Sequence, residues 1–170
     1  MRRKVLFGDY PVRILVLFLG ASALLAGLVL LAGLLLPATR EGRAQTVIAA
    51  SPDQILAVIA DVESQPEWRA VKAVTMTESG WIEAPMRGEQ ISFVAEEMTA
   101  TRVRLRFASA AGLSGAWEAV MEQVPGGTLI RIVERTTSPS PIGRITARLF
   151  FDPTSFAEEY LAALKARVEA

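Results

Sequence analysis

The 170-residue chain contains no histidine and no cysteine. Histidine is the commonest general base near neutral pH and a frequent metal ligand, and cysteine supplies thiolate nucleophiles and metal-binding sulfur. Their absence excludes disulfides and most zinc and nucleophilic-thiol chemistry. We therefore predict no metal site and no cofactor, and any acid–base chemistry would fall to carboxylates.

Familiar catalytic motifs are missing as well. The chain has no Gly-rich phosphate loop, no serine nucleophile elbow and no metal-ligand spacing. Glu134, Glu118 and Asp61 are the candidates for a carboxylate with a raised pKa, but their spacing does not pair them. The sequence thus indicates no catalytic residue and favours binding over catalysis.

A basic surface is also absent, because acidic residues outnumber basic ones beyond residue 43. Arg102, Arg104 and Arg106 alternate, so they share one face of a strand, which we interpret as a solvated outer face. Without a basic field, the chain is not expected to bind nucleic acid.

One long hydrophobic run stands out, since residues 14–36 contain no charged side chain. This exceeds the roughly 20 residues that cross a bilayer core of about 30 Å. A buried core helix is disfavoured, because a domain of this size could hardly enclose a helix that is apolar on all sides. We predict a transmembrane helix at 14–36 after a basic flank at 1–13, with the lipid bilayer as a partner.

The alternative for this run is a cleaved secretory signal, with a basic start and Gly42-Arg43-Ala44 as the cleavage site. The run is longer than the usual apolar region of about 7 to 15 residues in a signal peptide, which favours the membrane span. Whether the segment is ever cleaved stays open.

Basic residues near the two ends of the span predict its orientation. Arg2, Arg3, Lys4 and Arg13 precede the span, whereas Arg40 and Arg43 follow it. Because Lys and Arg are retained on the cytoplasmic side, we expect a single-pass protein with a cytoplasmic N-terminus and an extracytoplasmic C-terminal domain. Residues 37–43 are expected to form a short linker to that domain.

Residues 44–170 alternate between helical and strand patterns. A strand at 46–50 leads into Ser51-Pro52-Asp53-Gln54, which has the form of a capping box and starts a helix that Pro66 should end. Ser140-Pro141 opens a second helical segment, and Asp152-Pro153 interrupts or re-caps it. Between them, period-two alternation predicts strands at 71–77, 80–84, 88–96, 101–108, 116–123 and 128–136.

The predicted sheet has one apolar face, as Ile91, Phe93 and Ala95 illustrate. The last helix carries an apolar stripe that needs a partner, and the apolar face of the sheet is available. The stripe comprises Phe156, Tyr160, Leu164 and Val168.

Three stretches of residues 44–170 carry a family resemblance: Ile48 through Ser51-Pro52 to Ile55, Asp61 through Pro66 to Trp68, and Pro125-Gly126-Gly127-Thr128 before an alternating strand. Their order resembles the START-related helix-grip (SRPBCC) superfamily, which includes polyketide cyclase/dehydrase and lipid-transport proteins. The resemblance implies an α+β helix-grip fold, in which an antiparallel sheet curves around a long C-terminal helix. Gln65 departs from the pattern, because many relatives have an aromatic residue there.

The resemblance further implies a cavity between the sheet and the C-terminal helix. Glu134 shares strand parity with Ile130 and Ile132 and would point inward, although a rim carboxylate in water is the alternative. A solid core is the alternative to the cavity as a whole. The candidate lining residues are Trp68, Ile91, Phe93, Leu105, Phe107, Trp117, Ile130, Ile132, Glu134, Phe156 and Tyr160.

We predict from these features a membrane-tethered domain that binds or transfers a hydrophobic, lipid-like small molecule. One alternative is an interaction subunit of a membrane complex, with a solid core and a membrane protein partner. A less favoured alternative is a cyclase/dehydratase-like enzyme. An enclosed void would favour binding, and a filled core would favour the interaction subunit.

Overall fold

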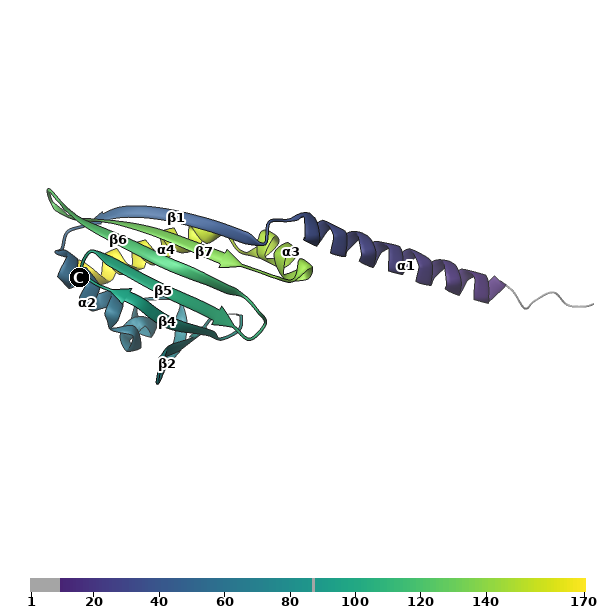
Figure 1. Cartoon of the computed structure of the whole chain (residues 1–170), viewed down its shortest axis with the longest axis horizontal. Helices are drawn as coiled ribbons and strands as arrows, with labels where there is room; N and C mark the ends of the chain where they lie inside the picture. Colours follow the sequence, from purple (N-terminus) through teal and green to yellow (C-terminus); the bar gives the residue numbers. More distant parts are fainter. Residues whose placement is uncertain (1–9, 87) are drawn as a thin grey trace, which may run out of the picture.

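The computed structural model describes residues 10–86 and 88–170. A long helix projects from one end of an α+β domain (Figure 1). The helices are α1 (Tyr10–Leu35), α2 (Pro52–Ala60), η1 (Val62–Glu67, a 3-10 helix), α3 (Pro141–Phe150) and α4 (Pro153–Val168). The strands are β1 (Thr39–Ile48), β2 (Val71–Thr77), β3 (Gly80–Pro85), β4 (Ile91–Met98), β5 (Arg102–Ser109), β6 (Ser114–Val124) and β7 (Gly127–Thr137).

The strands form one antiparallel sheet in the order β1-β7-β6-β5-β4-β3-β2. Every strand from β2 to β7 pairs with its neighbour in sequence, and β1 returns to the edge beside β7. Helix α4 lies against β1 and β7, and α2 packs on α4 and β6 (Figure 1). The predicted arrangement of a long C-terminal helix on one face of an antiparallel sheet is therefore present.

The hydrophobic core lies between the sheet and these helices. Ile48, Ile55, Ile130 and Leu164 are fully buried, and they come from β1, α2, β7 and α4 respectively. On the opposite face of the sheet, Arg102, Arg104 and Arg106 are exposed, and ion pairs join them to Glu96 or Glu118. Strand parity thus predicted the two faces of β5 correctly.

The expected helix starts are present. The Ser51 amide donates to Gln54 Oε1 (2.9 Å) while Ser51 Oγ accepts from the Gln54 amide (3.3 Å), which completes the capping box. Ser140 Oγ accepts from the Gly143 amide at 2.8 Å. Asp152 Oδ1 accepts from the amide of Thr154 at 3.1 Å, so Asp152 separates α3 from α4.

The end predicted for α2 was wrong. The α-helix ends at Ala60 because Asp61, with ψ of 71°, leaves the helical region. The chain continues as the 3-10 helix η1, which contains Pro66. Proline cannot donate the i to i−4 hydrogen bond of an α-helix, but a short 3-10 segment accommodates it.

The linker predicted at residues 37–43 was also wrong over most of its length. Strand β1 begins at Thr39, which pairs with Thr137 of β7. The sequence pattern did not indicate a strand here, because the segment is polar and an edge strand can carry charged side chains on its outward side. Glu41 illustrates this, since it forms an ion pair with Arg135 of β7. Residues 36–38 are therefore all that separates α1 from the sheet.

The alternation predicted for residues 88–96 fails at its end. The pairing of β4 with β5 shifts register between Ala95 and Glu97, which indicates a β-bulge. Beyond a bulge the inward-facing positions change parity, so Met98 lines the cavity although Ile91 and Phe93 on the same strand have the opposite parity.

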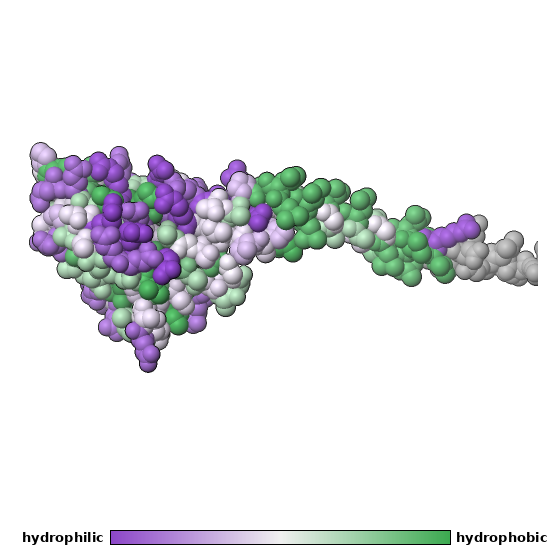
Figure 2. Space-filling model, viewed as in Figure 1, coloured by the Kyte–Doolittle hydropathy of each residue, from purple (hydrophilic) through white to green (hydrophobic). Residues whose placement is uncertain are grey.

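Helix α1 is apolar and exposed. Residues Val12–Leu35 are long and apolar enough to cross a membrane, and their hydrophobic surface contrasts with the mixed hydrophilic and apolar surface of the domain (Figure 2). This length and composition suit a membrane span and also a signal sequence. Arg2, Arg3 and Lys4, on which the predicted orientation depends, lie outside the described residues.

Replacing Gly42 by alanine should destabilise the domain. A Cβ at this position of β1 would overlap the backbone of Pro153 and Thr154 at the start of α4. We expect Gly42→Ala to lower the free energy of unfolding by about 1 to 3 kcal/mol, as overpacking does. Urea unfolding of the full chain in mild detergent measures this. Gln45→Ala, at an exposed position of β1, is the control, and equal midpoints would contradict the packing argument.

Candidate ligand-binding cavity

A cavity of about 680 Å³ lies between the sheet, η1, α3 and α4. This volume falls within the range of pockets that hold small organic ligands. The walls are mostly apolar, and they come from residues far apart in the sequence, from Ile59 to Tyr160. The domain is therefore hollow, which answers the choice between a cavity and a solid core.

Most of the residues predicted to line the cavity do so. Trp68, Ile130 and Ile132 do not: the two isoleucines are buried in the hydrophobic core, and Trp68 packs edge-on against Tyr160 with 5.9 Å between ring centroids. The predicted residues that line the cavity are Ile91, Phe93, Leu105, Phe107, Trp117, Glu134, Phe156 and Tyr160.

Aromatic rings form two of the walls. On the β3–β5 side, Trp81 stacks on Phe93 with 5.4 Å between centroids, and Phe93 packs against Phe107 at 5.6 Å. Across the cavity, Trp117 of β6 meets Tyr160 of α4 in a T-shaped contact at 5.2 Å. Interlocked rings of this kind hold wall positions firmly and offer a flat apolar surface to a ligand.

A buried ion pair forms the polar part of one wall. The two guanidinium nitrogens of Arg69 each lie 3.3 Å from one Glu83 oxygen, and Trp81 Nε1 donates to Glu83 Oε1 at 3.1 Å. Arg69 also donates to the buried Gln65 amide oxygen and lies over the Tyr160 ring, 4.9 Å from its centroid. Both charges are therefore held by several partners, as burial requires.

Sequence analysis missed this polar cluster. Glu83 follows Trp81 by two residues on β3, so strand parity could have placed the two side chains on the same face. Gln65 lies in η1 and Arg69 follows it, and in this irregular segment no periodic pattern indicates where a side chain points. Gln65 is buried, and its side-chain amide oxygen accepts a hydrogen bond from the Arg69 guanidinium.

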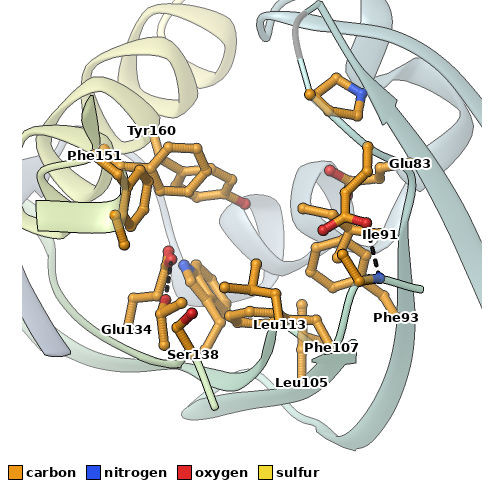
Figure 3. A pocket seen from close by; sticks show the side chains of 18 of the residues that line it. Glu83, Ile91, Phe93, Leu105, Phe107, Leu113, Glu134, Ser138, Phe151 and Tyr160 are labelled. Atoms are coloured by element: carbon orange, nitrogen blue, oxygen red, sulfur yellow. Dashed lines mark hydrogen bonds between the residues drawn. The ribbon is translucent and has the colours of Figure 1, made fainter. Parts of the chain in front are cut away.

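Glu134 supplies a second polar group, on the opposite side of the cavity from Glu83 (Figure 3). It is 5% exposed, and the Thr136 hydroxyl donates to its Oε1 at 3.2 Å. Burial raises the pKa of Glu134 to about 7, although the Thr136 hydrogen bond and the charge of Arg69 act in the other direction. This carboxyl therefore titrates near neutral pH, and the rim position weighed from sequence does not apply.

Tyr160 adds a phenol to these polar groups. Its hydroxyl projects into the cavity (Figure 3), and burial raises its pKa to about 12, so it stays protonated. Among its buried polar groups the cavity has a neutral phenol, one ion pair and one carboxyl that is half ionised near pH 7, and the exposed Glu89 also lines it. Such a lining can hydrogen-bond the polar end of a mainly apolar molecule.

The cavity opens beside α3. Its exposed lining residues include Gly88 in the loop after β3, Ala111 in the loop after β5, Thr146 and Phe150 in α3, and Phe156 in the first turn of α4. Helix α3 also packs against α1 (Figure 1). The mouth therefore lies at the end of the domain from which the apolar helix projects.

No protein-family model and no curated protein matches this chain. Solved structures resemble it in fold. They include a START superfamily protein from Mycobacterium smegmatis, with a TM-score of 0.57 and 15% identity, covering 77% of this chain and 97% of that one.

Two further neighbours are named enzymes. The Zhui aromatase/cyclase from Streptomyces sp. R1128 has a TM-score of 0.61 and 14% identity, over 77% of this chain and 94% of that one. Norcoclaurine synthase from Thalictrum flavum, solved with a transition-state analogue, has a TM-score of 0.60 and 12% identity, over 77% of this chain and 94% of that one. Such identities establish the fold alone. The domain has the helix-grip fold, which it shares with these three proteins.

The raised pKa of Glu134 predicts a pH-dependent stability. Between the ordinary value of 4.5 and about 7, the folded protein binds more protons than the unfolded chain. The free energy of unfolding should therefore fall by roughly 3 kcal/mol as the pH rises from about 5 to about 8. Glu134→Gln should remove most of this slope and exceed the wild type in stability at the higher pH.

Urea unfolding at a series of pH values measures the slope. Glu122→Gln, which changes an exposed carboxylate on β6, should keep the wild-type slope. Equal slopes for the two variants would contradict a buried, protonated Glu134.

The Arg69–Glu83 pair should behave as a buried unit. Arg69→Met leaves an uncompensated carboxylate and should cost roughly 3 to 5 kcal/mol of unfolding free energy. Adding Glu83→Gln should recover part of the loss, because the orphaned charge disappears. Arg131→Met, which breaks the exposed pair with Glu122, should cost at most about 1 kcal/mol. Equal costs for the two arginines would exclude a buried charge pair.

Proposed function

We propose that this protein is a membrane-tethered domain that binds an amphipathic, mainly hydrophobic small molecule in its cavity. The observation that carries the proposal is the cavity of about 680 Å³, which combines aromatic walls with a few convergent polar groups. Pockets of this composition are typical of ligand sites, in which apolar surface supplies affinity and polar groups fix orientation.

The polar groups indicate what the ligand carries. Arg69 and Glu83 neutralise one another, so this side of the cavity has no net charge to attract a strongly ionic ligand. Glu134 and Tyr160 offer hydrogen bonds to a hydroxyl or carbonyl oxygen on the ligand. A lipid-like molecule with one neutral polar end suits both walls.

The tether rests on α1. As a membrane span, α1 keeps the cavity beside a bilayer and raises its effective concentration there without any new contact. The basic residues before the span favour a cytoplasmic N-terminus and an extracytoplasmic domain. A hollow domain disfavours the alternative of an interaction subunit with a solid core.

Native mass spectrometry of the full chain, released from mild detergent, tests the proposal. A co-purifying ligand should appear as a 1:1 adduct, and lipid extraction should identify it. The polypeptide mass also reports whether the N-terminal segment has been cleaved.

A pair of variants on β4 sharpens the test. Ile91→Trp puts a larger side chain into the cavity and should lower the bound fraction at least several-fold, whereas Val94→Trp places the same side chain at an exposed position on the same strand. Apo protein in both the wild type and Val94→Trp, with no uptake of a lipid extract from the same cells, would refute ligand binding.

A second candidate is acid–base catalysis on a bound molecule, and the position of Glu134 in the cavity favours it. A carboxyl that titrates near pH 7 can both donate and accept a proton. If Glu134 is catalytic, Glu134→Gln should accumulate substrate, so the molecule extracted from this variant should differ from that of the wild type in mass or, for an isomerisation, in chromatographic retention. Identical extracts favour simple binding.

A further inference from the structure

Helix α3 carries an apolar face that nothing covers within the described residues. Ile142 is 59% exposed, and Leu149 is 68% exposed. They are seven residues apart and therefore lie on one side of the helix. Phe150, 84% exposed, lies at the edge of the same side and also lines the cavity mouth.

The opposite side of α3 is basic. Arg144 and Arg148 are two and six residues after Ile142, which places them across the helix from the apolar face. A short helix with exposed apolar residues on one side and arginines on the other has the character of helices that lie in the plane of a membrane interface.

Contacts hold α3 at the end of α1. Gly33 of α1 is buried, and a Cβ there would overlap the backbone of Pro141, the first residue of α3. The Arg144 guanidinium donates to the carbonyl oxygens of Leu34 (3.3 Å) and Leu36 (3.4 Å), which the end of α1 leaves unpaired. Arg40 of β1 donates to the Ala147 and Phe151 carbonyl oxygens at the other end of α3. Helix α3 is thus attached to α1 at its N-terminal end and to β1 at its C-terminal end.

This attachment sets the depth of α3 if α1 spans a bilayer. Gly33 lies two residues before the end of the apolar run at Leu35, a rise of only about 3 Å along the helix axis. Pro141, which touches Gly33, must then lie at the boundary between hydrocarbon and headgroups. The apolar side chains of α3 would otherwise meet water at that boundary, whereas the bilayer surface can take them up.

We propose that α3 is a membrane-docking helix, whose apolar face of Ile142, Leu149 and Phe150 enters the bilayer surface and seats the cavity mouth against it. The proposal rests on α1 being a membrane span, as in the proposed function. Because Thr146, Ala147 and Phe150 of α3 line the mouth, a ligand in the outer part of the bilayer reaches the cavity without crossing open water. The occupant of this face is lipid, not protein.

The chain has no cysteine, so single nitroxide labels can be placed on an otherwise native full-length protein. We would label Leu149→Cys in α3, Leu25→Cys in the middle of α1, and Val47→Cys, an exposed position about 26 Å along β1 from its start. Each labelled protein is reconstituted in phosphatidylcholine vesicles. Electron paramagnetic resonance then compares label accessibility to molecular oxygen, which concentrates in lipid, and to a water-soluble nickel chelate.

The expected result is a several-fold higher ratio of oxygen to nickel accessibility at Leu149 than at Val47, with the ratio at Leu25 higher still. A ratio at Leu149 equal to that at Val47, with Leu25 in lipid, would overturn docking by α3 while leaving the span intact. A water-accessible Leu25 would overturn the span, and with it both proposals. A Leu149 label reached by neither reagent would identify a protein partner or a second copy on this face, which also overturns the proposal.

Discussion

The difference in width between a single helix and a seven-stranded sheet determines most of this structure. Neighbouring strands are about 4.8 Å apart, so seven of them span roughly 29 Å, whereas a helix with its side chains is about 10 Å wide. Helix α4 lies over β1 and β7, and α2 covers part of β6. Within residues 10–86 and 88–170, no helix packs on the apolar face of β3, β4 and β5, and on this side the curved sheet borders a cavity instead of a solid core. The cavity is thus a consequence of topology.

The same difference in width explains which parts of the site could be predicted from sequence. Strand alternation indicates the face on which a side chain lies, and on that basis Leu105, Phe107 and Glu134 were placed correctly on the inner side. Alternation does not indicate what covers that face. Ile130 and Ile132 share the parity of Glu134, yet they lie in the packed core, because tertiary packing decides between core and cavity.

Polar residues were harder to interpret from sequence than apolar ones. The Arg69–Glu83 pair joins an irregular segment to a strand, and no periodic pattern connects them. Residues 39–43 were interpreted as a linker because their outward side chains are charged, as on an edge strand. Their backbone hydrogen bonds to β7 cannot be inferred from the side-chain pattern. In both cases the missing information was a long-range partner.

The brevity of the segment between Leu35 and Thr39 has a consequence for exchange. Three residues span at most about 11 Å, and Arg40 and Arg144 fasten α3 across this junction. With α1 in a bilayer, the domain has no freedom to swing toward a second membrane. If the cavity binds a ligand as proposed, the domain would exchange it with the adjacent leaflet of the same bilayer, or with a protein that approaches laterally in the same membrane. Transport between distant membranes would require another carrier.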